Sequence, residues 1–97
     1  MTEDQQLSLL GSRLRSERIG RNDSQAAFAA RIGISIPTLR KMEEGDGSVR
    51  IGHWVQALRV LNRDRDLDMI LAPKEDLFAK FDRLNAPSRK RASKKRA

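Results

Sequence analysis

The stretch "SQAAFAARIGISIPTLRKMEEG", residues 24–45, decides the fold of this 97-residue chain. Its first part predicts a short helix over residues 25–31, with Ser24 as the N-cap because a serine hydroxyl can accept a hydrogen bond from a free N–H of the first turn. Gly33 follows as the predicted end, because glycine adopts the left-handed backbone at little steric cost. The stretch therefore opens with a capped helix and a tight turn.

A second helix is predicted directly after the turn. Ser35 is its predicted N-cap, and Pro37 lies in its first turn, where a missing N–H costs nothing. The helix is expected to run to about Glu44 and to stop at Gly45. Two short helices joined by a glycine-containing turn form a helix-turn-helix, whose second helix enters the major groove of DNA.

The apolar residues of this stretch predict which sides of the two helices are buried. In the first helix the predicted apolar face comprises Ala26, Ala27, Phe28, Ala30 and Ile32. In the second, Leu39 and Met42 are expected to anchor the helix, with Ile34 as an apolar plug between the two. The residues left on the exposed face are Ile36, Thr38, Arg40 and Lys41.

Helical spacing of apolar residues continues on both sides of this stretch. Residues 5–20 are predicted as a helix with Leu7, Leu10 and Leu14 on one face, and Asn22 as its stop. A further helix has the predicted buried positions Ile51, Trp54, Val55, Leu58 and Leu61. Because no alternating pattern typical of strands appears, the predicted fold class is all-α.

Three regions are predicted along the chain. Residues 1–72 form a helix-turn-helix DNA-binding domain that includes an apolar segment suited to dimerisation. Residues 73–87 form an amphipathic C-terminal segment that ends at Pro87. Residues 88–97 are a basic tail, expected to be disordered because it has too little apolar surface to offset the entropy of ordering.

The positive charge is concentrated in two zones. The net charge is +7, and the tail "SRKRASKKRA" carries six cations and no acid. Residues 12–41 hold seven cations against Glu17 and Asp23. A basic surface on a small domain is typical of nucleic-acid binding, and a merely solubilising surface is the alternative.

Several other functions are not expected. The chain has no cysteine and one histidine, His53, so no metal site, cofactor or catalytic residue is predicted. Trp54 is assigned to the core. The N-terminus is acidic and lacks a long apolar run, so a secretory signal and a membrane span are not expected, and a cytoplasmic location is.

From Leu10 to Leu61 the chain resembles the lambda-repressor/Cro-like (XRE) helix-turn-helix domains, on the motif "SQAAFAARIGIS-PTL" followed by "EEG". The resemblance implies a compact five-helix domain. The helical spacing of Leu77, Phe78, Phe81 and Leu84 predicts an additional short C-terminal helix. The resemblance also implies a double-stranded DNA partner. Together with the charge pattern, it makes these the expected DNA-binding residues: Gln25, Ser35, Ile36, Pro37, Thr38, Arg40, Lys41 and Arg50.

The resemblance also implies individual roles. Gln25 matches a glutamine that contacts a phosphate and steadies the recognition helix. Arg18 and Glu43 match a structural ion pair between the first and third helices. Arg40 can reach either a phosphate or a guanine edge.

Four positions depart from the family pattern. Ile36 stands where a base-reading glutamine is common; it can contact a thymine methyl group but cannot hydrogen-bond. Glu17 and Asp23 occupy positions that are usually apolar, so they either weaken the core or serve as caps. Arg50 stands where a Ser or Thr cap is common, and its charge opposes the helix dipole unless a phosphate binds there.

The C-terminal half, from "HWVQALRVLNRDRDLDMILAP" onward, is similar to HipB-type antitoxins, which repress their own operon and bind a HipA-like kinase toxin. Dimer or partner contacts are expected at Leu67, Met69, Ile70, Leu71, Phe78 and Phe81. Phe78 and Phe81 can instead pack on the chain's own core. A free-standing repressor, from a phage or a housekeeping system, and a protein-interaction module with weakened DNA readout remain alternatives. Ser88 and Ser93 lie among basic residues where a kinase can modify them.

Overall fold

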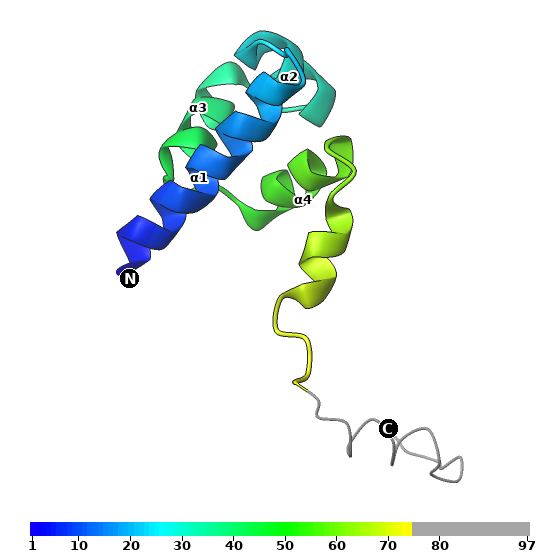
Figure 1. Ribbon diagram of the computed structural model, residues 1–97. Coiled ribbons are helices and arrows are strands. Elements are labelled where there is room, and N and C mark those ends of the chain that lie inside the picture. Colours follow the sequence, from blue (N-terminus) through cyan, green and yellow to red (C-terminus); the bar gives the residue numbers. More distant parts are fainter. Residues whose placement is uncertain (75–97) are drawn as a thin grey trace, which may run out of the picture.

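The computed structural model describes residues 1–74, and the chain turns back on itself through four α-helices and one 3₁₀ helix (Figure 1). The elements are α1 (Glu3–Gly20), α2 (Gln25–Ile32), α3 (Ile36–Glu44), α4 (Ile51–Val60) and η1 (Asp64–Met69). These residues contain no strand, so the predicted all-α domain of five helices is confirmed. The predictions for Phe78, Phe81, Ser88, Ser93 and the tail 88–97 lie outside the described residues.

Side-chain caps begin the first three helices. Ser24 accepts a hydrogen bond from the Ala27 N–H at 3.0 Å, and Ser35 accepts one from the Thr38 N–H at 3.2 Å, as predicted. α1 begins two residues earlier than predicted because Thr2 and Gln5 form a capping box, in which each side chain accepts from the other's backbone N–H.

Residues with a left-handed backbone conformation end these helices at the positions predicted from the sequence. Gly33 (φ 85°) ends α2 and Gly45 (φ 81°) ends α3, and Asn22 adopts φ 60° two residues after α1. Each of these residues redirects the chain within one or two positions. The short turns that result bring α2 and α3 against each other and against α1.

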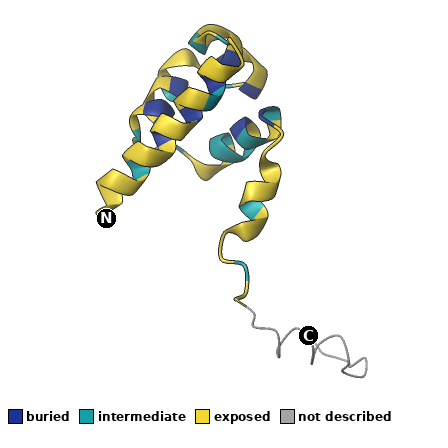
Figure 2. Cartoon of the chain, viewed as in Figure 1, coloured by how far each residue is buried: buried dark blue, intermediate teal, exposed yellow. Residues whose placement is uncertain are grey.

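The core lies where α1, α2, α3 and α4 meet (Figure 2). Phe28, Leu39 and Met42 are fully buried, which confirms the two predicted anchors of α3. The remaining buried apolar residues are Leu14, Ala29, Ile32, Ala57 and Leu61, with Ile34, Val49, Trp54 and Val60 packed against them.

The predicted apolar face of α2 was partly wrong. Ala26, Ala27 and Ala30 are exposed, whereas Ala29, which was not predicted, is buried. Phe28, Ala29 and Ile32 share one side of the helix, and Phe28 sets which side faces the core because it is the largest apolar residue there. The other alanines then lie on the opposite side.

One further burial prediction was wrong. Ile51 is 72% exposed, because it begins α4 and precedes the part of the helix that packs on the core through Ala57. Leu10, whose spacing from Leu14 predicted the helix, is 44% exposed and lines a surface groove.

Gly11 allows α1 to approach the end of α3 at backbone distance. A Cβ atom added at Gly11 would lie 2.5 Å from the Met42 carbonyl oxygen and 2.6 Å from that of Glu43. At Gly45 an added Cβ would lie 2.7 Å from the backbone of Leu7. These two glycines let the backbones of α1 and α3 touch, which sets the position of α3 on the domain.

Within residues 1–74, no helix is both long enough and apolar enough to cross a membrane.

Candidate nucleic-acid interface

One side of α3 faces solvent while the other is fully buried. Ile36, Pro37, Arg40 and Lys41 are exposed and Thr38 is half-buried. At the start of the helix the Ser35 and Thr38 hydroxyls are 2.8 Å apart and hydrogen-bonded, so both polar groups are ordered before any ligand binds. The exposed side is thus cationic, with one apolar residue, Ile36, at its N-terminal end.

A buried ion pair attaches α3 to α1. Arg18 donates from Nε to Glu43 Oε2 at 2.6 Å and from Nη2 to Oε1 at 3.1 Å. The side chains are 9% and 4% exposed, respectively. The hydrogen bonds to Glu43, and then its charge and that of Asp23, raise the pKa of Arg18 against the opposing effect of burial. Arg18 therefore stays charged although it is buried.

Gln25 and Arg40 extend this ion pair to the surface. Gln25 Nε2 donates to Glu43 Oε1 at 3.1 Å, and Arg40 Nε donates to Gln25 Oε1 at 3.3 Å. Gln25 begins α2, so the bonds connect α1, α2 and α3. They lie beside an open hollow of about 440 Å³ that is lined by Arg15, Gln25, Arg40, Glu43 and Glu44.

A second hollow, of about 180 Å³, lies between α3 and the start of α4. Arg50 is the N-cap residue of α4 and makes no side-chain capping bond. The N-terminus of a helix and two cations, Lys41 and Arg50, form a suitable site for an anion such as a phosphate. The lining residues are Thr38, Lys41, Ser48, Val49, Arg50 and His53.

The loop before α4 is held by Asp46. Its carboxylate accepts from the Ser48 hydroxyl at 2.6 Å and from the Ser48 N–H at 2.8 Å. These two bonds, with a smaller contribution from the charge of Lys41, lower the pKa of Asp46. This turn was not predicted, although aspartate side chains commonly accept a hydrogen bond from the backbone N–H two residues later.

Glu17 and Asp23 neither cap a helix nor lie unpaired in the core. Glu17 lies 3.5 Å from Arg63. The Asp23 carboxylate is 3.4 Å from Arg31 and 3.6 Å from Arg21. Ser24, not Asp23, caps α2. Both acids are thus paired with arginines that the sequence analysis did not single out.

The apolar residues after α4 are mostly uncovered. Leu67 is half-buried, whereas Met69 is 75%, Ile70 61% and Leu71 97% exposed. η1 leaves the helical body beside α4 and leads the chain away from it (Figure 1).

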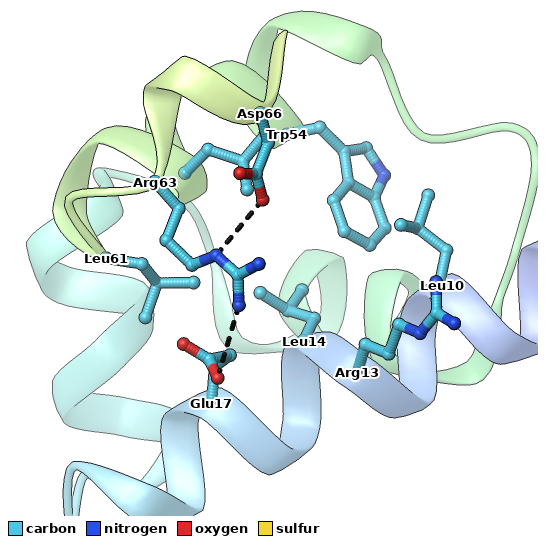
Figure 3. A pocket seen from close by; sticks show the side chains of 9 residues that line it. Leu10, Arg13, Leu14, Glu17, Trp54, Leu61, Arg63 and Asp66 are labelled. Carbon is cyan, nitrogen blue, oxygen red and sulfur yellow. Dashed lines mark ion pairs between the residues drawn. The ribbon is translucent and has the colours of Figure 1, made fainter. Parts of the chain in front are cut away.

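A groove of about 150 Å³ lies between α1, α4 and η1 (Figure 3). Trp54 and the leucines form its apolar walls, and Arg63 reaches over it to Glu17 at 3.5 Å and Asp66 at 3.0 Å. Trp54, predicted as a core residue, packs against the core and also lines this groove, which no sequence pattern had indicated. Its lining residues are Leu10, Arg13, Leu14, Glu17, Trp54, Leu58, Leu61, Arg63 and Asp66.

Comparison with known proteins agrees with this architecture. The family model described as "Helix-turn-helix domain" matches residues 9–68, from α1 into η1 and well over half of the chain. No curated protein and no solved structure matches the chain. The matched region contains α2, the turn at Gly33 and α3 with its exposed cationic side. The chain belongs to the helix-turn-helix domain family, whose members bind DNA and regulate transcription.

Proposed function

We propose that this protein is a sequence-specific transcriptional repressor that binds an inverted-repeat operator as a homodimer. One observation carries the proposal: α3 is anchored through fully buried Leu39 and Met42 and presents Ile36, Arg40 and Lys41 to solvent. A recognition helix needs this arrangement, because its own side chains must reach base edges while its backbone stays fixed.

The proposed DNA contacts fall into two groups. Ile36, Pro37, Thr38 and Lys41 face the bases, with Ile36 against a thymine methyl group. Ser35, Gln25 and Arg50 lie at helix starts, where they are suited to phosphates. The Lys41 ammonium group forms no hydrogen bond or ion pair within residues 1–74, where only the backbone carbonyl of Lys41 accepts, so this group is available to DNA.

Dimerisation is proposed through the segment that follows η1. A single helix-turn-helix covers few base pairs, and such domains gain affinity by binding two half-sites one helical turn apart. Met69, Ile70 and Leu71 form a run of exposed large apolar residues, which is typical of an interface. A second copy of the chain that covers this run would place two recognition helices on one operator.

We also propose that the protein is an antitoxin. In this role it represses its own operon by binding the operator there, and it binds a HipA-like kinase toxin. The similarity of residues 53–73 to HipB-type antitoxins supports it. The free-standing repressor and the interaction module without DNA readout are the other outcomes of the test.

DNA binding is tested by fluorescence anisotropy on a duplex that the wild-type protein selects from a random-sequence library. Lys41→Ala should weaken binding and change the preferred bases. Arg59→Ala is the control, because it removes an exposed cation near the end of α4, away from α3. If the wild-type protein selects no duplex at moderate salt, the chain is an interaction module.

The dimer and the toxin are tested by light scattering. The protein alone should have the mass of a dimer, and Ile70→Glu should halve it, whereas Ile51→Glu, at another exposed isoleucine, should not. Co-expression with the product of the adjacent gene should give a stoichiometric complex with a kinase-like protein that loses its toxicity. A dimer that binds its promoter but no neighbour would be a free-standing repressor.

A further inference from the structure

The hydrogen-bonded path from the buried ion pair ends on a residue of the DNA-facing surface. Arg18 and Glu43 are buried, Gln25 is half-buried and Arg40 is exposed. The successive bonds are Arg18 to Glu43 at 2.6 and 3.1 Å, Gln25 to Glu43 at 3.1 Å, and Arg40 to Gln25 at 3.3 Å. Arg40 is therefore attached to a rigid part of the core through a single amide.

The chemistry of its two neighbours fixes the orientation of the Gln25 amide. An ionised Glu43 only accepts hydrogen bonds and a guanidinium only donates them. With the amide rotated by 180°, its oxygen would face the Glu43 carboxylate and its NH₂ group would face Arg40. Both bonds would then be lost, so Gln25 Oε1 must point to Arg40.

This bond engages Arg40 at one atom only. Nε is the donor to Gln25, and no hydrogen bond of Nη1 or Nη2 is present within the described part of the chain. The two terminal NH₂ groups remain available as a pair that can bind two oxygen atoms side by side. Gln25 thus orients the guanidinium and leaves its terminal NH₂ groups able to bind a ligand.

We propose that Gln25 is a positioning residue that holds Arg40 ready to bind a DNA phosphate. This inference rests on the proposed DNA-binding function and assigns Arg40 to the backbone, not to a base edge. Its carrying observation is the attachment to Gln25, which draws the guanidinium toward the start of α2.

The charges around Arg40 favour an anionic ligand. Arg15 lines the same hollow, and Glu43 is neutralised by Arg18. Glu44 is the remaining carboxylate of the lining, so the hollow holds two free cations against one free anion. Phosphate is the anion that duplex DNA presents at every step, whatever its sequence.

The first test is a double-mutant cycle on the selected duplex. Gln25→Met keeps the shape of the side chain and removes both hydrogen bonds. It should weaken binding about threefold to tenfold, because an unrestrained arginine must be ordered on binding. In the Arg40→Ala background the same change should have a clearly smaller effect, because only the phosphate contact of Gln25 itself is then lost. Equal effects of Gln25→Met in both backgrounds would overturn the positioning role.

Arg15→Ala is the matched control. It removes a cation that lines the same hollow but has no bond to Gln25 within residues 1–74. Its effect should therefore add to that of Gln25→Met. Arg40→Ala should weaken binding by the same factor on duplexes with altered bases, and should lower the salt dependence by about one counterion. A changed base preference would overturn the phosphate assignment.

A measurement without DNA separates this inference from the proposed function. Rotation of the Arg40 guanidinium about Nε–Cζ, followed by NMR in the free protein, should be slower in the wild type than in Gln25→Met. Equal rates would overturn the attachment even if DNA binds. If the wild-type protein selects no DNA, the proposed function and the phosphate assignment fall together, and the NMR result still decides whether Gln25 orients Arg40.

Discussion

Arg18 of α1 and Glu43 of α3 are 25 residues apart in the sequence and joined by two hydrogen bonds in the fold. The Arg18 Nη1 atom also donates to the Asp23 carbonyl oxygen at 2.8 Å, just before α2. One guanidinium thus ties α1 to both helices of the helix-turn-helix. The exposed side of α3 depends on this group for its placement.

Removal of either partner of this ion pair should be costly. Arg18→Met leaves Glu43 buried with Gln25 as its remaining partner, and the expected loss is about 3 kcal/mol of unfolding free energy. Urea denaturation followed by circular dichroism measures it. Arg18→Met combined with Glu43→Leu should recover part of this loss, because no uncompensated charge is left in the interior.

The matched control for this prediction is Glu17→Gln, which breaks the exposed pair with Arg63. Exposed pairs contribute little, so the expected change is below about 0.5 kcal/mol. If Glu17→Gln lowered the unfolding free energy as much as Arg18→Met, the buried pair would not be the main ionic link between α1 and α3.

Gly11→Ala should destabilise the domain. Its methyl group would meet the backbone carbonyls of Met42 and Glu43 at 2.5 and 2.6 Å, so α3 must move away from α1. The expected loss is about 2 to 3 kcal/mol by thermal or urea unfolding. DNA affinity should also fall, since the same displacement shifts the recognition helix.

Gly52→Ala is the counterpart in α4. Apart from the neighbouring residues and the backbone of α4 itself, no atom lies within 4 Å of a Cβ placed there, and alanine is the better helix former. The change should stabilise the protein by about 0.5 to 1 kcal/mol. If Gly11→Ala and Gly52→Ala destabilised the fold by the same amount, the close contact between α1 and α3 would not explain the loss of stability in Gly11→Ala.

Arg50→Ser should separate stability from binding. Serine can supply the capping bond that Arg50 does not make, and the expected gain is about 1 kcal/mol. The same change removes a cation from the hollow between α3 and α4, so affinity for DNA should fall and its salt dependence should decrease by about one counterion. Thermal unfolding and anisotropy measure the two effects. An unchanged affinity would show that no phosphate binds at Arg50.

Ser48→Ala should raise the pKa of Asp46 toward its ordinary value, because the hydroxyl makes the largest contribution to the lowered pKa. Since the pKa of Asp46 in the folded state is below that in the unfolded state, its carboxylate stabilises the fold above the unfolded-state pKa. That contribution disappears as the pH falls through the folded-state pKa. NMR titration of the Asp46 side chain in wild type and variant measures the shift. An unchanged pKa of Asp46 in Ser48→Ala would contradict the assignment of the shift to the Ser48 hydroxyl.

Much of the local structure could be predicted from the residues alone. Ser24 and Ser35 cap helices, and Gly33 and Gly45 end them, because each of these interactions spans at most four positions. Burial was predicted well for Leu39 and Met42. It was predicted poorly for the alanines of α2, because small apolar residues occur on either side of a helix with similar cost.

The candidate site was predicted as a set of residues but not as an arrangement. The helical period placed Arg40 and Lys41 on the exposed side of α3. Their different surroundings could not be read from their adjacent positions, because Gln25, which binds Arg40, lies 15 residues earlier. The groove over Trp54 escaped prediction for the same reason, since α1, α4 and η1 each contribute one wall.

The sequence by itself determined where each helix of the helix-turn-helix begins and ends, because caps and left-handed turns are local chemistry. Only the tertiary structure decided how α3 is held. The contact at Gly11, the Arg18–Glu43 ion pair and the bond from Gln25 to Arg40 all join residues at least 15 positions apart. Such contacts form only when packing of Phe28, Leu39 and Met42 brings the helices together.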